Sequence, residues 1–213
     1  MPIKIRDYDN YEAYLEHQKE KTKNPLRRER LSNISGIREY FKIRFTNILR
    51  HHNFLKRLEK GFVSKNVDDS WPPHTKVLCL GARLGEEVRA FRDLGFEDAI
   101  GVDLVPNEPY VITADFHDLP FESGAIEIIY TNAIDHSCKP EKMIEEAFRC
   151  LKPGGYLIID YYPGHMGGYE ACQIDTFEDM VGLIPEKIAY VASGTYIPHT
   201  FTGPCTELIL VKH

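Results

Sequence analysis

Two features of the sequence, a glycine-rich turn and an aspartate, have the residue types and the spacing needed to bind a nucleoside-like cofactor. The turn is Gly81-Ala82-Arg83-Leu84-Gly85, and it follows a short apolar run at 76–80. Glycine lets the backbone come close to a ligand, and the amides at a helix start favour an anionic group. Asp103 stands 22 residues after Gly81, close to the spacing of ~20 residues at which an acid meets a ribose diol.

Each feature alone also has a simpler interpretation. A glycine-rich turn can merely join a strand to a helix, and an aspartate at a strand end is often a cap. Their combination favours a nucleoside-type cofactor, because one carboxylate can accept hydrogen bonds from both ribose hydroxyls.

The elements around these residues alternate between strand and helix. Apolar runs of strand length occur at 76–80, 99–103, 110–114, 125–131 and 156–161, and a closing strand pair is expected at 188–192 and 207–211. Helical periodicity follows the turn up to Gly95, begins again at Pro140 and ends before Pro153-Gly154-Gly155, and a further helix is expected near 176–183. This alternation predicts an α/β fold, a mostly parallel sheet with helices on both faces, and ligands bind beyond the carboxyl ends of its strands.

The N-terminal region has a different pattern. Residues 8–23 predict a short helix with Tyr8, Tyr11, Tyr14 and Leu15 on one side, and apolar residues from Ile37 to Leu55 predict a second helix. Residues 63–75 have the composition of a linker. We therefore expect a helical extension or cover over residues 1–70 and an α/β domain over 71–213.

Five segments in order resemble the class I S-adenosylmethionine-dependent methyltransferases. They are 77–85 (VLCLGARLG), 101–103 (GVD), 114–121 (ADFHDLPF), 128–136 (IIYTNAIDH) and 151–156 (LKPGGY). The Asp-x3-Leu-Pro-Phe stretch and the Leu-Lys-Pro-Gly-Gly turn are the most specific. The resemblance covers 76–160 well and 176–213 loosely. It implies S-adenosyl-L-methionine as cofactor and a Rossmann-like sheet of seven strands, the last of them antiparallel.

The resemblance also implies a role for each matching residue. The methionyl part of the cofactor would lie along Gly81, Ala82, Arg83 and Gly85. Asp103 would bind the ribose hydroxyls and Leu104 would pack on the adenine. The adenine edge would be read by Asp115 and by the backbone amide of Phe116, and Asn132 would border the cofactor.

Two positions depart from the pattern of that family. Cys79 stands where an acid is usual, and Arg83 stands where a glycine is usual. The missing acid puts one contact to the loop and to the methionyl amine in doubt. Arg83 could instead reach the cofactor carboxylate with its planar guanidinium. Glu86 and Glu87 could serve the amine, although acids in the first turn of a helix also simply complement its dipole.

Methyl transfer from a sulfonium needs alignment more than it needs a base, because the cofactor carries the activated group. Where the acceptor is protonated, His136 is the leading base and Asp135 could orient the site; the alternative is that His136 only caps local structure. The glycine-rich loop at 161–169 could cover the acceptor through Tyr161 and His165, or it could be an ordinary surface loop. No metal site is predicted.

Composition limits the setting and the partners. The five cysteines are scattered, no CxxC pair occurs, and no apolar stretch suggests a signal peptide or a membrane span, so a reducing, cytoplasmic location is expected. Residues 1–60 contain 15 Lys and Arg against 8 Asp and Glu, whereas residues 61–213 contain 11 against 24. The basic segment could dock an anionic partner, but the net charge of −6 and the absence of an aromatic-interleaved basic motif disfavour nucleic acid.

We therefore predict a methyltransferase that acts on an oxygen or nitrogen of a small-molecule or saccharide acceptor. One alternative is a non-catalytic binding module of the same fold, which the cysteine at position 79 keeps open. The other is an NAD-dependent oxidoreductase, which would share the glycine turn and the strand-end acid but not the later segments.

Overall fold

A seven-stranded sheet forms the centre of the computed structural model, which describes residues 3–23, 38, 41, 42, 45, 74–185, 188–196 and 205–212. The spatial order of the strands is β4-β3-β2-β5-β6-β9-β8. Their bounds are β2 (Val77–Leu80), β3 (Ile100–Asp103), β4 (Val111–Thr113), β5 (Ile126–Thr131), β6 (Leu151–Tyr161), β8 (Ile188–Tyr196) and β9 (Cys205–Lys212). The first five are parallel, and β9 runs antiparallel between β6 and β8.

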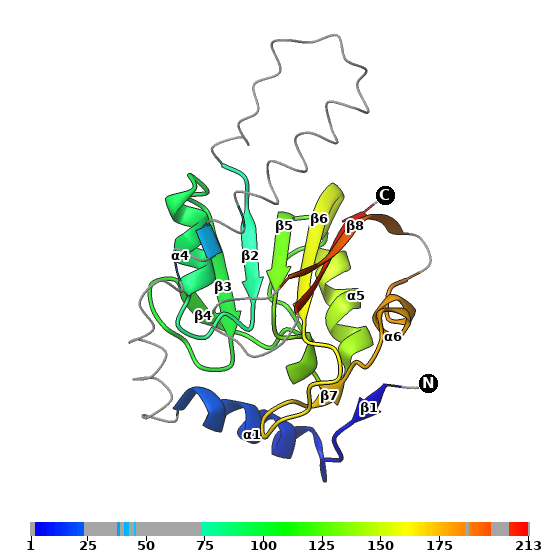
Figure 1. Ribbon diagram of the computed structural model, residues 1–213. Coiled ribbons are helices and arrows are strands. Elements are labelled where there is room, and N and C mark those ends of the chain that lie inside the picture. Colours follow the sequence, from blue (N-terminus) through cyan, green and yellow to red (C-terminus); the bar gives the residue numbers. More distant parts are fainter. Residues whose placement is uncertain are drawn as a thin grey trace.

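The order of the strands reverses at β2, which lies between β3 and β5. This is the kind of switch point at which open α/β sheets bind ligands. The carboxyl ends of β2, β3 and β5 point toward the same edge of the sheet, and Figure 1 shows the N-terminal helix lying across that edge.

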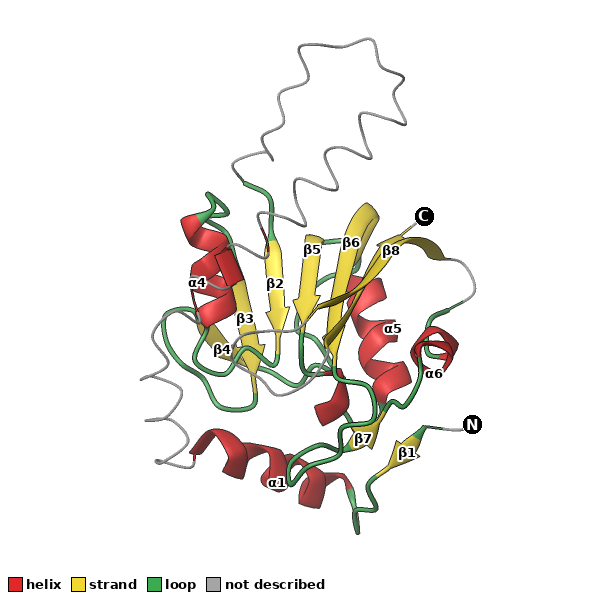
Figure 2. Ribbon diagram, in the orientation of Figure 1, coloured by secondary structure: helices red, strands yellow, loops and turns green. Residues whose placement is uncertain are grey.

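Alternate residues of the central strands fill two apolar cores, one on each face of the sheet. Leu78 and Leu80 of β2 belong to one core with the helix α5 (Pro140–Cys150). Val77 and Cys79 belong to the other core with the helix α4 (Glu86–Asp93). The two helices therefore cover opposite faces, as the near-continuous apolar strands predict (Figure 2).

Local sequence explains where the helices begin. Pro140 occupies the first turn of α5, where its missing N–H costs nothing. The short helix α6 (Phe177–Gly182) starts with a capping box, because Thr176 accepts from the backbone of Asp179 and Asp179 accepts from the backbone of Thr176. A 3-10 turn, η1 (Ile134–His136), follows β5, and its residues are buried.

The helix α5 ends at Cys150, before Pro153-Gly154-Gly155 as the sequence predicts, but the following strand starts earlier than the expected position 156. The strand β6 begins at Leu151, which pairs with Ile126, and the register shifts before Tyr156 pairs with Ile128. Gly154 adopts a φ of 76° within this irregularity. The proline-glycine segment therefore forms a bulge inside the strand.

The N-terminal segment begins with a strand that the sequence pattern did not indicate. β1 (Lys4–Ile5) pairs antiparallel with β7 (Cys172–Gln173) in a separate two-stranded sheet. The helix α1 (Tyr11–Lys23) follows. It starts later than position 8 because Asn10 accepts the N–H of Ala13 at 2.9 Å, as an N-cap does.

Most of the second predicted N-terminal helix, and the linker at 63–75 up to residue 73, lie outside the described residues. Phe41 and Phe45 are described, helical and buried. Phe45 stacks on Phe91 of α4 with ring centroids 3.9 Å apart, so these two phenylalanines pack on the α4 face of the sheet. Among the described helices, none is long and apolar enough to cross a bilayer.

Candidate cofactor and acceptor pocket

A pocket that is partly open to solvent lies at the carboxyl edge of the sheet. Segments that follow four parallel strands line one side of it, and α1 lines the other. The residues are Gly81, Arg83, Asp103, Leu104, Asp115, Phe116, Ala133 and His136 on the sheet side, and Tyr14, Gln18, Lys21 and Thr22 from α1. Seven of the residues predicted from the sequence therefore meet in one pocket.

The turn after β2 is held in a shape that glycine makes possible. Gly81 has a φ of 68°, and a Cβ added to it would lie 2.6 Å from the Cβ of Ala133. Gly85 has a φ of 76° and caps the start of α4. Ala82 is buried and donates its N–H to the carbonyl of Val102 at 3.0 Å. Gly81 thus borders the pocket, while Ala82 and Gly85 hold the loop against the sheet.

Asp103 links this turn to the end of β3. One carboxylate oxygen accepts the N–H of Arg83 at 3.0 Å, and the other accepts the N–H of Val105 at 3.1 Å. Burial raises the pKa of this carboxyl above its usual value. Each carboxylate oxygen has two lone pairs, so Asp103 keeps the capacity to accept hydrogen bonds from a vicinal diol in the pocket.

Asp115, at the end of the neighbouring strand β4, is bound by the N-terminal helix. Its Oδ2 accepts from the hydroxyl of Tyr11 at 2.6 Å, and its Oδ1 accepts the N–H of His117 at 2.8 Å. Burial acts to raise the pKa of Asp115, but these hydrogen bonds outweigh it and the pKa is lowered. Burial and the contact with Asp115 raise the pKa of Tyr11. Asp115 therefore stays ionised and fastens α1 to the edge of the sheet.

His136 and Asp135 lie on η1, and both are buried. His136 lines the pocket, and its Nδ1 lies 3.1 Å from the carbonyl oxygen of Tyr169. The Oδ1 of Asp135 has no hydrogen-bond partner among the described residues, and it lies 3.8 Å from Nε2 of His136. Burial raises the pKa of Asp135 to about 6. Glu170 is also buried, and its carboxylate lies close to Asp135 and His136.

A carboxylate from α4 stands beside Cys79, where the sequence lacks its expected acid. The charge of Glu87 adds to burial in raising the pKa of the Cys79 thiol. Burial raises the pKa of Glu87 itself to about 7. The side-chain amide of Asn132 donates to Glu87 at 3.4 Å. Glu87 thus places a carboxyl group from the helix within electrostatic range of Cys79 and Arg83.

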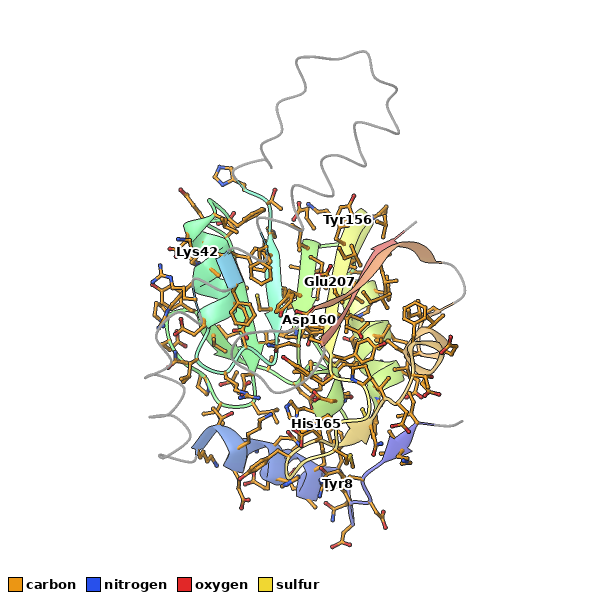
Figure 3. The ribbon with its side chains drawn as sticks, in the orientation of Figure 1. Tyr8, Lys42, Tyr156, Asp160, His165 and Glu207 are labelled. Carbon is orange, nitrogen blue, oxygen red and sulfur yellow. The ribbon has the colours of Figure 1, made fainter. Side chains whose placement is uncertain are left out.

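Five further predicted residues lie away from the pocket lining. Asn132 points to Glu87, and Ala82 and Gly85 support the turn. Tyr161 is buried in the core beneath α5 and α6, because β6 directs it inward. His165 is more than half exposed and lies 3.6 Å from Glu170 in the loop near α1 (Figure 3). Their positions give Tyr161 a packing role and leave His165 at the margin of the site.

Sequence reasoning missed the contribution of α1. Tyr14, Gln18, Lys21 and Thr22 are buried and line the pocket, although three of them are polar. Their spacing follows one face of a helix, and that periodicity was the available signal. A search for apolar periodicity does not find this face, because most of its residues are polar. Such a search finds the side of the helix that contains the tyrosines and Leu15.

Part of the chain is similar to known proteins. Residues 78–159 match the family model described as "Methyltransferase domain". A sarcosine/dimethylglycine N-methyltransferase of Aphanothece halophytica is 35% identical over 107 residues, which cover 42% of this chain and 39% of that protein. An uncharacterised methyltransferase of Mycolicibacterium gilvum is 29% identical over 126 residues, 49% of each chain. The chain thus spans less than half the length of these curated relatives.

A solved structure with the same fold covers nearly the whole chain. It is the 1,6-didemethyltoxoflavin-N1-methyltransferase of Burkholderia thailandensis, solved with 1,6-didemethyltoxoflavin and S-adenosylhomocysteine bound. The TM-score is 0.65 at 12% identity, over 99% of this chain and 94% of that one. At this identity the likeness concerns the fold alone, an α/β fold with a mostly parallel central sheet.

Proposed function

We propose that this chain, whose residues 78–159 form a methyltransferase domain, is an enzyme that transfers a methyl group from S-adenosyl-L-methionine to a small acceptor. The observation that carries the proposal is the convergence of Asp103 and Asp115 on one pocket. They end adjacent parallel strands, and the Gly81 turn at the switch point of the sheet borders the same space.

The residues of the pocket fit an adenosyl group. Asp103 retains lone pairs for two ribose hydroxyls, Leu104 and Phe116 offer apolar surface for a purine, and Asp115 is an ionised acceptor for an exocyclic amine. Bound there, S-adenosyl-L-methionine would supply an electrophilic methyl group on a sulfonium. The carboxylates of the pocket would also favour that positive charge. Glu87, close to the turn, takes the position of the acid that Cys79 does not provide.

The acceptor side of the pocket is the corner formed by α1, η1 and the loop before β7. We propose that it takes a small molecule, or a saccharide unit, with a reactive oxygen or nitrogen. The N-methyltransferase relative supports nitrogen. The pocket favours a small acceptor, because α1 covers its open side and reaches Asp115 and His136 across it.

His136 is the residue proposed to take a proton from such an acceptor. The carbonyl of Tyr169 can only accept a hydrogen bond, so the contact at Nδ1 places the ring proton there. In the neutral ring, Nε2 then carries the lone pair. The carboxylate of Asp135 lies beside Nε2, and we propose that its negative charge helps to orient the groups of the site.

Isothermal titration with S-adenosylhomocysteine and with NAD tests the cofactor assignment. The proposal predicts saturable binding of the adenosyl compound and none of NAD, and the reverse result would favour an oxidoreductase. A release assay for S-adenosylhomocysteine, run over small amines including sarcosine and dimethylglycine, hydroxylated compounds and sugars, tests the reaction. We expect His136→Ala to lower turnover and to leave cofactor affinity unchanged; unchanged turnover would remove His136 from the mechanism.

We further propose that the N-terminal region, residues 1–70, acts as the cover of the domain at 71–213. The support is α1, whose residues close the pocket that the later segments form.

A further inference from the structure

Lys21, near the end of α1, is a buried lysine inside the proposed active site. It is only 5% exposed and lines the pocket together with Arg83 and His136. Its Nζ is in direct hydrogen-bonding contact with Nε2 of His136. Lysine is seldom buried unless its charge is matched by polar or acidic neighbours. The polar and acidic neighbours of Lys21 therefore account for its burial.

The direction of the hydrogen bond between Lys21 and His136 follows from the other side of the ring. Nδ1 of His136 lies 3.1 Å from the carbonyl oxygen of Tyr169, which must be an acceptor, so Nδ1 carries the proton. An ammonium group has donors only. With Lys21 in its ammonium form, Nζ donates to the lone pair of Nε2, and a ring that accepts there is a neutral His136.

Without Lys21, the surroundings of His136 would favour its charged form. An oxygen of Asp135, a ring nitrogen of His136 and a carboxylate oxygen of Glu170 all lie within 4.8 Å of one another. A nearby carboxylate favours an imidazolium by about 1–3 pKa units. An imidazolium has no lone pair with which to accept a proton from an acceptor molecule.

The charge of Lys21 opposes this tendency. As a cation in contact with the ring, it disfavours an imidazolium. It also partly neutralises the field of the two carboxylates, whose ionised forms it favours. Arg83 acts on Asp135 in the same sense, and His165 is the further basic group beside Glu170. Lys21 contacts the ring of His136 directly.

We propose that Lys21 is a positioning residue that holds His136 neutral, with Nε2 available as a proton acceptor at neutral pH. The N-terminal helix is then part of the reactive site as well as its cover. The consequence for turnover depends on the proposed methyltransferase function. The consequence for the charge of His136 does not depend on that function.

The test is nitrogen-detected NMR of the histidine rings in the full chain, with His136→Gln used to assign the signal. In the wild-type protein at pH 7 we expect a neutral His136 with the proton on Nδ1. In Lys21→Met, we expect its titration midpoint to move to higher pH by about one unit or more. Lys21→Arg keeps the charge and should stay near the wild-type midpoint. Lys19→Met, on the same helix, removes a lysine that pairs with Glu16 at the surface and should change nothing.

An unshifted midpoint in Lys21→Met, or a shift of equal size in Lys21→Arg, would overturn the proposal. Should Lys21→Met fail to fold, the wild-type spectrum still decides, because a charged ring at pH 7 or a proton on Nε2 contradicts it. In turnover assays, the acid limb of the pH profile of kcat/KM should move upward with the NMR midpoint. Failure to find any methyl transfer would refute the proposed function and leave the NMR result to decide the role of Lys21.

Discussion

Replacing Gly81 by alanine should damage both the stability of the domain and its pocket. The added Cβ would lie 2.6 Å from the Cβ of Ala133, a backbone-attached atom that cannot swing away. The left-handed backbone at φ 68° costs an L-residue about 1–2 kcal/mol, and the overpacking costs about 1–3 kcal/mol more. We therefore expect a loss of about 2–5 kcal/mol in the free energy of unfolding, measured by urea denaturation.

Gly124 provides a matched control for this substitution. Its φ is 70°, almost that of Gly81, but no heavy atom lies within 4 Å of an added Cβ. Gly124→Ala should therefore cost only the backbone term, about 1–2 kcal/mol. Because Gly81 and Ala133 both border the pocket, Gly81→Ala should also weaken S-adenosylhomocysteine binding about tenfold or more in calorimetry. Equal destabilisation by the two variants, with cofactor affinity intact in Gly81→Ala, would refute the steric reasoning.

Two other changes test the electrostatic contacts that hold the fold and the cover. Arg149 is the main cause of lowering the pKa of Glu146 from 4.5 to about 2, so this carboxylate stabilises the fold above about pH 4.5 and loses that effect as the pH falls toward 2. Glu146→Gln should lower the free energy of unfolding by about 2 kcal/mol at pH 7, allowing for the partial exposure of Arg149. In denaturation experiments below pH 4.5, the difference in this free energy between variant and wild type should become smaller. Tyr11→Phe removes the hydroxyl that donates to Asp115. The amides of α1 should then exchange hydrogen faster, by a factor corresponding to about 1.5–3 kcal/mol. Tyr8→Phe is the control, and equal exchange rates in the two variants would contradict the role of Asp115 in holding α1.

Much of the sheet could be predicted because its strands are short, apolar and buried on both faces. A parallel sheet with both faces covered is the structure that buries such runs, and it forms from those at 76–80, 99–103 and 125–131. The residues at the ends of those strands could be predicted for the same reason, since parallel strands bring their carboxyl ends to one edge. Gly81, Asp103 and Asp115 meet there, although they are separated in sequence.

What could not be predicted depends on contacts between distant segments. The buried polar face of α1 is stabilised by partners far along the chain: Gln18 donates to the carbonyl of Tyr169, and Lys21 contacts His136. The two-residue strand β1 exists only because it pairs with β7. The sequence places Tyr161 where a strand meets a loop that could cover the acceptor, but β6 directs it into the core.

The most direct test of the proposed cofactor site is calorimetric titration of S-adenosylhomocysteine into the wild-type protein and into Asp103→Ala. Since Asp103 both orders the turn and faces the pocket, the account predicts one saturable site in the wild type. It also predicts a loss of affinity of at least about tenfold in a variant that circular dichroism shows to be folded. Affinity that is equal in the two proteins, or absent from the wild type, would contradict it.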